Sequence, residues 1–267
     1  MFNARINRIF ILTLLFKMSY FDFLDVLKKD TVHLIVEVGS RDLVDAIKLL
    51  NYYDCTLYAF ECNPDCLIEC KKQLDTLTDA SKSKLFLIDK AVSLENGPVT
   101  FYPFDLNKYD NMGASSMLKI DFSVRTENDP EYKRENPQKE ITVNGIRLDT
   151  FMSEKNIPAI DLLCIDLQGY ELNAIKSLGD FIQNIKYIIT ECSIQSTYTN
   201  GATFKELYDY FTKNNFIYVC SNKFGYKFPD LTLKGFSEFD ALFINRNMCD
   251  TLDEDIIPLV LGRPPLN

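Results

Sequence analysis

Residues 34–65 constrain the fold more than any other stretch of the chain. A short apolar run ends at Glu37, Gly39 breaks it, a segment with apolar residues at helical spacing follows, and a second apolar run ends at Glu61. This pattern predicts a β-α-β unit with an acid at the end of its second strand. In such units a ligand binds outside the carboxyl ends of the strands, where that acid can accept hydrogen bonds from two ribose hydroxyls. We therefore expect a nucleoside site here.

The turn after the first strand indicates which nucleoside fits. The three glycines of a dinucleotide site would stand at positions that hold Gly39, Arg41 and Val44 here, so only the first glycine is present. Glu37 would repel a pyrophosphate, but it would attract the ammonium and sulfonium groups of S-adenosylmethionine. The residues therefore favour S-adenosylmethionine over a nicotinamide dinucleotide. For these turn residues alone, a buried strand and glycine turn without any ligand is the alternative.

Length and charge exclude several classes of protein. The chain has 267 residues, 46% of them apolar, which suffices for one α/β domain with a sizeable core. A net charge of −9 at pH 7 argues against a nucleic-acid substrate and against an anionic membrane surface. Several of the eight cysteines fall inside apolar runs, as small buried residues of a reducing compartment do. We expect a cytoplasmic protein.

Cys62, Cys66 and Cys70 follow the second strand at a spacing that raises the question of a metal cluster. The cluster motif of radical enzymes closes with two intervening residues, whereas both spacings here are equal and match one stripe of a helix. Asn63 and Pro64 support a helix as its N-cap and its first-turn residue. We therefore interpret the three cysteines as a helical stripe and not as metal ligands.

We divide the chain into an N-terminal extension and helix (residues 1–30), one α/β domain (31–247) and a tail (248–267). The apolar run at residues 9–16 is too short to span a bilayer, which needs about 20 residues, so we expect no membrane segment. Met18 opens a fresh amphipathic segment, and the residues before it are predicted to be dispensable.

Inside the domain, residues 105–140 are polar and charged, with little periodicity. This stretch is too long for an ordinary connection, so we interpret it either as a flap over the substrate or as a disordered excursion. Directly after it, Asn144-Gly145 stands between two apolar runs and predicts a β-hairpin.

Further strands are predicted to end in polar residues. One ends at Asp89, with Lys90 and Ala91 after it, and a side chain there can edge an adenine ring. Another strand ends at Asp166 and a third at Glu191. Because ligands of α/β sheets bind outside the carboxyl ends of the strands, these residues are expected near the nucleoside site.

In order and approximate spacing these motifs resemble the FkbM-type methyltransferases. The segments that carry the resemblance are Glu37-Val-Gly-Ser, Phe60-Glu61-Cys-Asn63-Pro64, Lys90-Ala-Val-Ser93, Gly113-Ala-Ser-Ser116, Leu148-Asp149 and Ile165-Asp166-Leu-Gln-Gly169-Tyr-Glu171. The resemblance covers roughly residues 32–247. It implies a Rossmann-like class I α/β fold, with a seven-stranded, mostly parallel sheet and one antiparallel edge strand, and S-adenosylmethionine as methyl donor. It also implies methylation of a hydroxyl, often on a sugar or a glycosylated product.

Two positions depart from the family pattern. Leu43 stands where the first motif often has a glycine, which is expected to move the following helix slightly away from the cofactor. Gln168 stands where the fourth motif often has a glutamate, so the role of a carboxylate is not carried over to that position.

The predicted site has three parts. The cofactor contacts are expected to be Glu37, Gly39, Ser40, Glu61, Asn63, Asp89, Lys90 and Ala91. The substrate contacts are expected to be Ser115, Ser116 and Glu191. The resemblance implies Asp166 as the catalytic acid, which would act as general base or, with Glu191, hold a divalent cation that acidifies the hydroxyl; a helix cap is the structural alternative. His33 precedes the first strand, at the wrong edge of the sheet for catalysis.

We predict an S-adenosylmethionine-dependent O-methyltransferase that acts on a sugar, nucleotide-sugar or glycan. The flap offers Tyr109 and Asn111 for hydroxyl recognition. Its cations would either meet a diphosphate or belong to a solvated charged loop: Lys119, Arg125, Lys133 and Arg134. O-methylation of another small hydroxylated metabolite, a catalytically inactive cofactor-binding protein and a nicotinamide oxidoreductase stay open as alternatives, and so does a homodimer.

Overall fold

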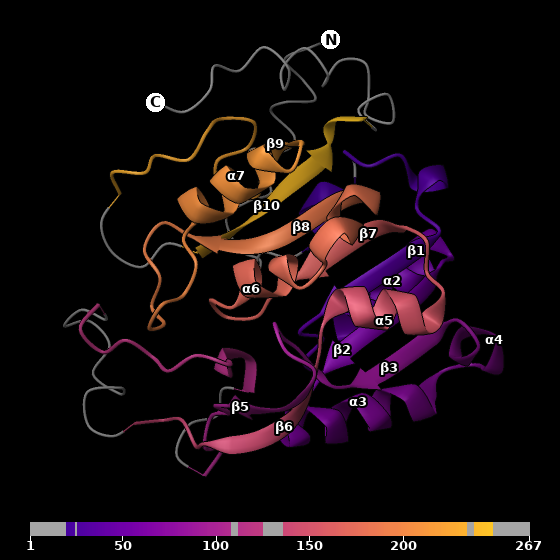
Figure 1. Cartoon of the computed structure of the whole chain (residues 1–267). Coiled ribbons are helices and arrows are strands. Elements are labelled where there is room, and N and C mark those ends of the chain that lie inside the picture. The colour runs from indigo at the N-terminus through magenta and orange to yellow at the C-terminus, as the bar shows by residue number, and fades with distance from the viewer. Residues whose placement is uncertain (1–19, 25, 108–111, 125–135, 234–237, 248–267) are drawn as a thin grey trace.

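The computed structural model describes residues 20–24, 26–107, 112–124, 136–233 and 238–247 (Figure 1). Its central element is a sheet of seven strands in the order β3-β2-β1-β7-β8-β10-β9. These strands are β1 (Leu34–Val38), β2 (Thr56–Glu61), β3 (Leu85–Asp89), β7 (Ile160–Ile165), β8 (Ile185–Ser193), β9 (Phe216–Ser221) and β10 (Glu238–Asn245). Neighbours from β3 to β8 run parallel, and β10 runs antiparallel to both of its neighbours. This topology confirms the predicted class I methyltransferase fold.

The strand order changes direction between β1 and β7. The chain proceeds from β1 to β2 and β3 on one side, whereas β7 and β8 lie on the other. Such a switch point leaves a crevice outside the carboxyl ends of the two strands, and ligands of open α/β sheets bind there. Val38 and Ile165 pair in register at these ends. The residues that follow them, Gly39 and Asp166, therefore lie side by side at these strand ends, and the N–H of Asp166 donates to the carbonyl of Val38 at 3.0 Å.

One detail of the sheet differs from the prediction. The antiparallel strand β10 lies between β8 and β9, so β9 is the edge strand and β10 is not. Asp240 of β10 pairs with Glu191 of β8. Because β10 runs against its neighbours, its first residues lie at the edge of the sheet where the parallel strands end.

Helices cover both faces of the sheet (Figure 1). One face carries α5 (Leu148–Lys155), α6 (Glu171–Lys176) and α7 (Phe204–Lys213), and the other carries α2 (Val44–Tyr53) and α3 (Pro64–Thr76). The smaller elements are α4 (Asp79–Lys82) and the 3-10 helices η1 (Tyr20–Phe23), η2 (Lys29–Thr31), η3 (Met112–Ala114) and η4 (Gly179–Asn184).

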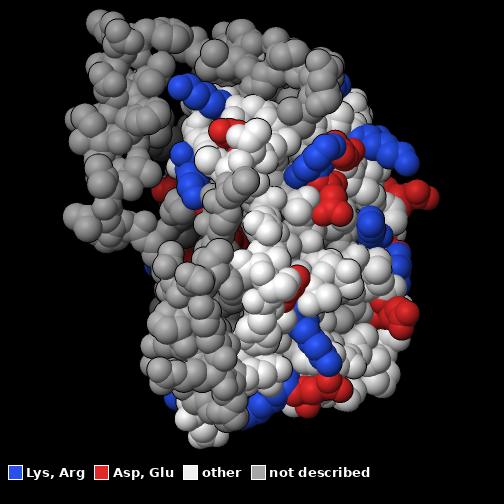
Figure 2. Space-filling model, turned by 90° about the vertical axis from the view of Figure 1, so that its left-hand side faces the viewer, with Lys and Arg blue, Asp and Glu red and all other residues white. Residues whose placement is uncertain are grey.

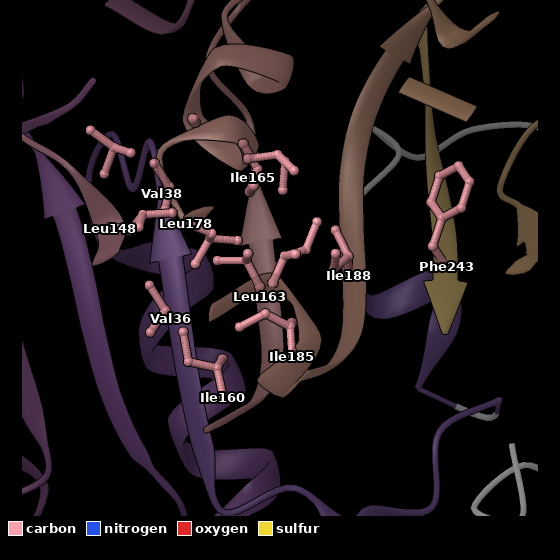
Figure 3. Close-up of a cluster of buried hydrophobic side chains, with 14 of the residues drawn as sticks. Val36, Val38, Leu148, Ile160, Leu163, Ile165, Leu178, Ile185, Ile188 and Phe243 are labelled. Atoms are coloured by element: carbon pink, nitrogen blue, oxygen red, sulfur yellow. The ribbon is translucent and has the colours of Figure 1, made fainter. Parts of the chain in front are cut away.

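Figure 3 shows the core on the side of α5, α6 and α7. Val36 and Val38 of β1 alternate with residues of the opposite core, and so do Leu163 and Ile165 of β7. All four are fully buried. With a helical layer on both faces, the central strands have no solvated side, which is why they are nearly continuous apolar runs in the sequence.

Helix α3 begins as predicted. The side chain of Asn63 accepts a hydrogen bond from the backbone N–H of Asp65 at 3.1 Å, and a proline occupies the first turn. Cys66 and Cys70 are buried on one stripe of the helix, and neither forms a disulfide. The helical interpretation is confirmed for Cys66 and Cys70, whereas Cys62 precedes the N-cap and lies outside the helix.

The predicted hairpin at Asn144-Gly145 is wrong. Residues 141–146 form one continuous strand, β6 (Ile141–Ile146), in a second sheet of order β4-β6-β5 with β4 (Ala91–Val92) and β5 (Gly97–Phe101). A glycine is needed at position 145 because the segment around Ser93 passes close to it, and not because the chain turns there. A Cβ at Gly145 would lie 2.7 Å from the Ser93 hydroxyl, so the strand passes too close to the β4 connection for a side chain.

The helix predicted near the N-terminus is also wrong. In place of one amphipathic helix, the chain forms the short 3-10 helices η1 and η2. Helical spacing would put Phe21, Leu24 and Leu27 on one buried stripe, but in the structure Phe23 and Leu27 are buried in the core on the α2 side and Phe21 and Leu24 are only partly buried. Residues 1–17 lie outside the described part of the chain. Among the described residues no helix is long and apolar enough to cross a membrane.

The described parts of residues 105–140 fold against a loop near Tyr198. Bridges join Tyr102 to Ser116 and Ile120 to Tyr198, and a small buried cluster of Phe104, Ala114, Ile120 and Tyr198 holds the two segments together. The predicted contacts Tyr109, Asn111, Arg125, Lys133 and Arg134 lie outside the described residues. On the face shown in Figure 2, acidic and basic side chains are interspersed over the described surface.

Candidate active site

The carboxyl ends of the strands open into a pocket of about 430 Å³, a volume typical of small-molecule sites. The predicted cofactor contacts that line it are Glu37, Gly39, Ser40, Glu61, Asn63, Lys90 and Ala91. The predicted substrate contacts Ser115, Ser116 and Glu191 and the predicted base Asp166 line it as well. Asp89 does not belong to the lining and is exposed at the end of β3. One pocket therefore brings together nearly all of the predicted site.

The turn after β1 is held close to the end of β7. Gly39 has a φ of +90°, and a Cβ there would lie 1.9 Å from the backbone oxygen of Asp166. The backbone N–H groups of Gly39 and Ser40 both donate to the carbonyl of Phe60 at 3.0 Å. Only glycine satisfies both the conformation and the contact, so the first residue of the turn is fixed by the adjacent strand end.

Leu43 adopts the conformation that suits the glycine of the family pattern. Its φ is +62°, in the left-handed region, and its side chain is fully buried. A left-handed conformation costs a residue with a Cβ about 1–2 kcal/mol. Burial of the leucine side chain offsets this strain, because a fully buried leucine contributes roughly 1.5–3 kcal/mol. The helix thus begins at Val44 with the glycine-type turn retained.

Glu37 has an unsatisfied polar atom beside the pocket. The residue is 1% exposed, and its Oε2 has no hydrogen-bond partner among the described residues. The Ser40 hydroxyl nearby is in the same situation. Burial raises the pKa of Glu37 to about 8. A buried carboxylate without a partner is costly, so this corner of the pocket favours a cationic, hydrogen-bonding ligand group.

Glu61, which is predicted to accept hydrogen bonds from two ribose hydroxyls, already accepts hydrogen bonds from the backbone. Its Oε1 accepts hydrogen bonds from the N–H groups of Cys62 and Asn63, both at 2.7 Å, and its Oε2 accepts one from Arg41 at 2.8 Å. A carboxylate has about four acceptor positions, so roughly one remains on Oε2. Burial raises the pKa of Glu61 to about 7. To accept both ribose hydroxyls, the carboxylate must give up the bond to Arg41.

The two predicted substrate serines join the described segment 112–124 to the rest of the site. The Ser115 hydroxyl accepts from the side-chain amide of Asn63 at 3.2 Å and donates to the carbonyl of Met112 at 3.0 Å. The Ser116 hydroxyl, which is buried, donates to the backbone carbonyl of Gln168 at 2.9 Å. Their part in binding a substrate stays a prediction, because both hydroxyls already serve these structural contacts.

Three carboxylates converge at the ends of β7 and β8. Asp166, Glu171 and Glu191 each have one oxygen within 4.8 Å of the others. The side-chain amide of Gln168 lies between two of them, and its Nε2 donates to Asp166 Oδ1 at 2.9 Å and to Glu191 Oε2 at 2.8 Å. The hydroxyl of Tyr198 lies 3.1 Å from Gln168 Oε1, which orients the amide. Gln168 thus holds the two acids in place.

The three acids have different environments. Glu171 Oε1 accepts the backbone N–H groups of Leu167 and Gly169 at 2.9 and 3.0 Å, so this side chain closes the turn before α6. Burial raises the pKa of Glu191, and the charge of Asp166 raises it further. Burial also raises the pKa of Asp166, against the hydrogen bond from Gln168. The N-cap of α6 is not Asp166 but the residue before Glu171.

Sequence reasoning missed several pocket residues, among them Tyr20 and Asp240. Asp240 enters because β10 is antiparallel, so its early residues reach the site; a search restricted to the last residues of strands could not find it. Burial raises the pKa of Asp240 to about 7. Its signal in the sequence is a charge at the start of an apolar run. Tyr20 comes from a segment far from any motif and has no such signal.

S-adenosylmethionine fits the donor end of this pocket. Its ammonium would satisfy the unpaired oxygen of Glu37, and its ribose would bind near Glu61, which lines the same pocket. Lys90 and Ala91 line the pocket beyond Glu61, where an adenine would extend.

Comparisons with known proteins identify the family of the chain. The family model described as "Methyltransferase FkbM domain" matches residues 38–218. The protein "2-O-methyltransferase NoeI" of Sinorhizobium fredii is 27% identical over 180 residues, which are 66% of this chain and 69% of that protein. The family match begins in β1 and ends in β9, so neither Tyr20 nor Asp240 falls within it.

Two solved structures are similar to the chain. The M. capricolum TrmK structure in complex with S-adenosyl-homocysteine has a TM-score of 0.39 and 13% identity, with 90% of this chain and 67% of that chain covered. The Methanococcus jannaschii fibrillarin pre-rRNA processing protein has a TM-score of 0.44 and 13% identity, with 83% of this chain and 70% of that chain covered.

Proposed function

Because the chain belongs to the FkbM methyltransferase family, and is therefore an S-adenosylmethionine-dependent methyltransferase, we propose that it methylates a hydroxyl group of a sugar or glycan. One observation carries the proposal: Asp166, an acid suited to accept a hydroxyl proton, lines the same pocket as the unsatisfied Glu37. The similarity to a 2-O-methyltransferase supports oxygen as the methylated atom.

The end of the pocket that contains Glu37 and Glu61, here called the donor end, would bind S-adenosylmethionine and align it with the acceptor. S-adenosylmethionine supplies a methyl group that its sulfonium has already activated. Glu37 would hold the ammonium of the donor, and Glu61 would hold a ribose hydroxyl. These contacts fix the direction of the transferred methyl, and alignment of two reactants can supply roughly 7–11 kcal/mol of the barrier.

The end of the pocket that contains Asp166, here called the acceptor end, would take a proton from the acceptor hydroxyl. An acceptor hydroxyl loses its proton as its oxygen bonds to the methyl carbon, and we assign that proton to the carboxylate of Asp166. Gln168 donates to Asp166 Oδ1, which favours the ionised form that can accept it. Glu191, bound to the same amide, keeps Gln168 in this orientation. Asp166 is thus the proposed base, with Gln168 and Glu191 as positioning residues.

A divalent cation at Asp166 and Glu191 is the alternative to direct proton transfer. The convergence of three carboxylates favours it, but the amide of Gln168 opposes it. Its Nε2 donates hydrogen atoms into the space between the two acids, where a cation would need oxygen ligands. We therefore propose that transfer proceeds without a metal.

The charges of the pocket suit a neutral acceptor. The acidic lining residues are Glu37, Asp42, Asp45, Glu61, Asp166, Glu191, Glu238 and Asp240. Among the described lining residues only Arg41 and Lys90 are basic. Lys119, one of the cations expected to meet a diphosphate, lies 3.5 Å from Glu140 instead. A free sugar or glycan therefore fits better than a nucleotide-sugar. The homodimer and the cytoplasmic location stay predictions.

The test is transfer of labelled methyl from S-adenosylmethionine to a panel of free sugars, glycans, nucleotide-sugars and aromatic alcohols. We expect labelling of a neutral sugar or glycan, unchanged by a chelator, and none with Asp166→Asn. Labelling of aromatic alcohols alone would assign the activity to another hydroxylated metabolite. Donor binding without transfer to any acceptor would favour a catalytically inactive protein.

A further inference from the structure

Tyr20 reaches the donor pocket from outside the matched family domain. The residue is 7% exposed and lines the pocket together with Glu37, Asp166 and Asp240. The family match begins only at residue 38, so nothing in that match assigns a role to it. Tyr20 therefore adds a phenol to a group of carboxylates that belong to three different strands.

The segment that carries Tyr20 is anchored in the core. Phe23 is 1% exposed and Leu27 is 4% exposed, and both pack in the cluster on the α2 side of the sheet. The backbone N–H groups of Val26 and Leu27 donate to the carbonyl of Phe23. Because the chain is fixed three residues after Tyr20, the position of the phenol is set by the fold.

The Tyr20 hydroxyl acts as a neutral donor. Burial and the charges of Asp166 and Glu37 raise its pKa well above the ordinary value of 10.0, so it keeps its proton at physiological pH. Its side chain makes no hydrogen bond to another described residue. Carboxylates surround it, and each of them can only accept hydrogen bonds when ionised. The phenol is thus a neutral donor beside the carboxylates of Glu37, Asp166 and Asp240.

The amino-acid end of S-adenosylmethionine carries an ammonium and a carboxylate side by side. Glu37 suits the ammonium but would repel the carboxylate. Arg41, the nearest basic residue of the turn, already pairs with Asp42 at 3.2 Å. Hydrogen-bond donors next to Glu37 are therefore needed; the Ser40 hydroxyl is one, and Tyr20 supplies another.

We propose that Tyr20 is a cofactor-binding residue whose hydroxyl donates a hydrogen bond to the carboxylate of bound S-adenosylmethionine, next to the ammonium held by Glu37. This inference rests on S-adenosylmethionine as the donor. It makes the segment before β1 part of the donor site, in addition to its place in the core.

Calorimetry with two ligands tests the contact. S-adenosylhomocysteine contains the amino-acid end, whereas 5′-methylthioadenosine lacks it but keeps the adenosine and a thioether. Tyr20→Phe removes only the hydroxyl, and we expect about tenfold weaker binding of S-adenosylhomocysteine, the scale of one hydrogen bond to a charged group, with unchanged binding of methylthioadenosine.

Tyr53→Phe is the matched control, because Tyr53 is another buried tyrosine of the same core cluster whose hydroxyl lacks a partner among the described residues and does not line the pocket. It should leave both affinities unchanged. Equal binding of S-adenosylhomocysteine by Tyr20→Phe and the natural protein would overturn the inference, and so would equal weakening of both ligands. If the natural protein bound neither ligand, the assignment of the donor itself would fall first.

Discussion

The backbone oxygen of Asp166 packs directly against Gly39. A Cβ added at Gly39 would lie 1.9 Å from this oxygen. The turn proposed to bind the methyl donor and the strand end that carries the proposed base are therefore in direct backbone contact. A shift of either one moves the other. We therefore expect donor binding and proton acceptance to be coupled by this contact and not only by their common pocket.

Gly39→Ala should weaken both functions. The substitution imposes a left-handed conformation on alanine, which costs about 1–2 kcal/mol, and forces β1 and β7 apart. We expect a melting temperature several degrees lower and at least tenfold weaker binding of S-adenosylhomocysteine. Gly97→Ala is the control, since Gly97 has a φ of +105° but no atom within 4 Å of an added Cβ. Equal effects of the two variants would show that conformational strain alone, and not the approach of Asp166, matters at Gly39.

Asp166→Asn should slow methyl transfer while leaving donor affinity nearly unchanged. If Asp166 is the general base, the rate at saturating acceptor falls by about 10²–10⁴. Glu171→Gln is the comparison, because Glu171 accepts two backbone N–H groups and its loss should lower the melting temperature first. Single-turnover rates and calorimetry separate the effects. A near-natural rate in Asp166→Asn would leave Asp166 a structural residue.

Local sequence patterns were enough to predict most of the strand-end residues that line the pocket. The apolar run before Glu37, the N-cap at Asn63 and the acid at the end of the second strand each depend on a few neighbouring residues. Because each pattern lies within one short segment, its local structure does not depend on how distant segments pack. Parallel strands then bring the strand ends to one edge of the sheet.

Long-range packing decided what the sequence could not predict. Asn144-Gly145 has a strong local turn preference, yet pairing of β6 with two strands holds it extended. Asp240 reaches the pocket because β10 inserts between β8 and β9, and Tyr20 because Phe23 is buried under α2. Each of these depends on contacts between segments far apart in the sequence, which no local pattern records.

Gln168→Glu should convert the acid cluster into a cation site. The variant removes the donor that joins Asp166 to Glu191 and adds a charge among acids, so the ligand-free protein should melt at a lower temperature. Mg²⁺ should restore much of the loss, because carboxylate oxygens now surround the space. The natural protein should show no shift with Mg²⁺. Gln168→Leu, which removes the donor without adding charge, should be destabilised without rescue; Mg²⁺ stabilisation of the natural protein would instead favour metal-assisted transfer.

Glu37 should make donor binding depend on pH. Burial raises its pKa from the ordinary 4.5 to about 8 in the folded protein, so between these values the folded state holds a proton that the unfolded state has lost. Its contribution to stability is present at low pH and is lost as the pH rises through about 8, and ionisation then provides the carboxylate that an ammonium needs. Affinity for S-adenosylhomocysteine should therefore rise between pH 6 and pH 8.5, whereas affinity for methylthioadenosine, which has no ammonium, should rise less. Burial also raises the pKa values of Glu61, Glu171 and Asp240 to about 7, so these groups change the affinity over the same pH range. They do so in both the natural protein and Glu37→Gln. The difference between the two pH profiles therefore reports Glu37 alone. Parallel pH profiles for the natural protein and Glu37→Gln would show that Glu37 does not hold the ammonium.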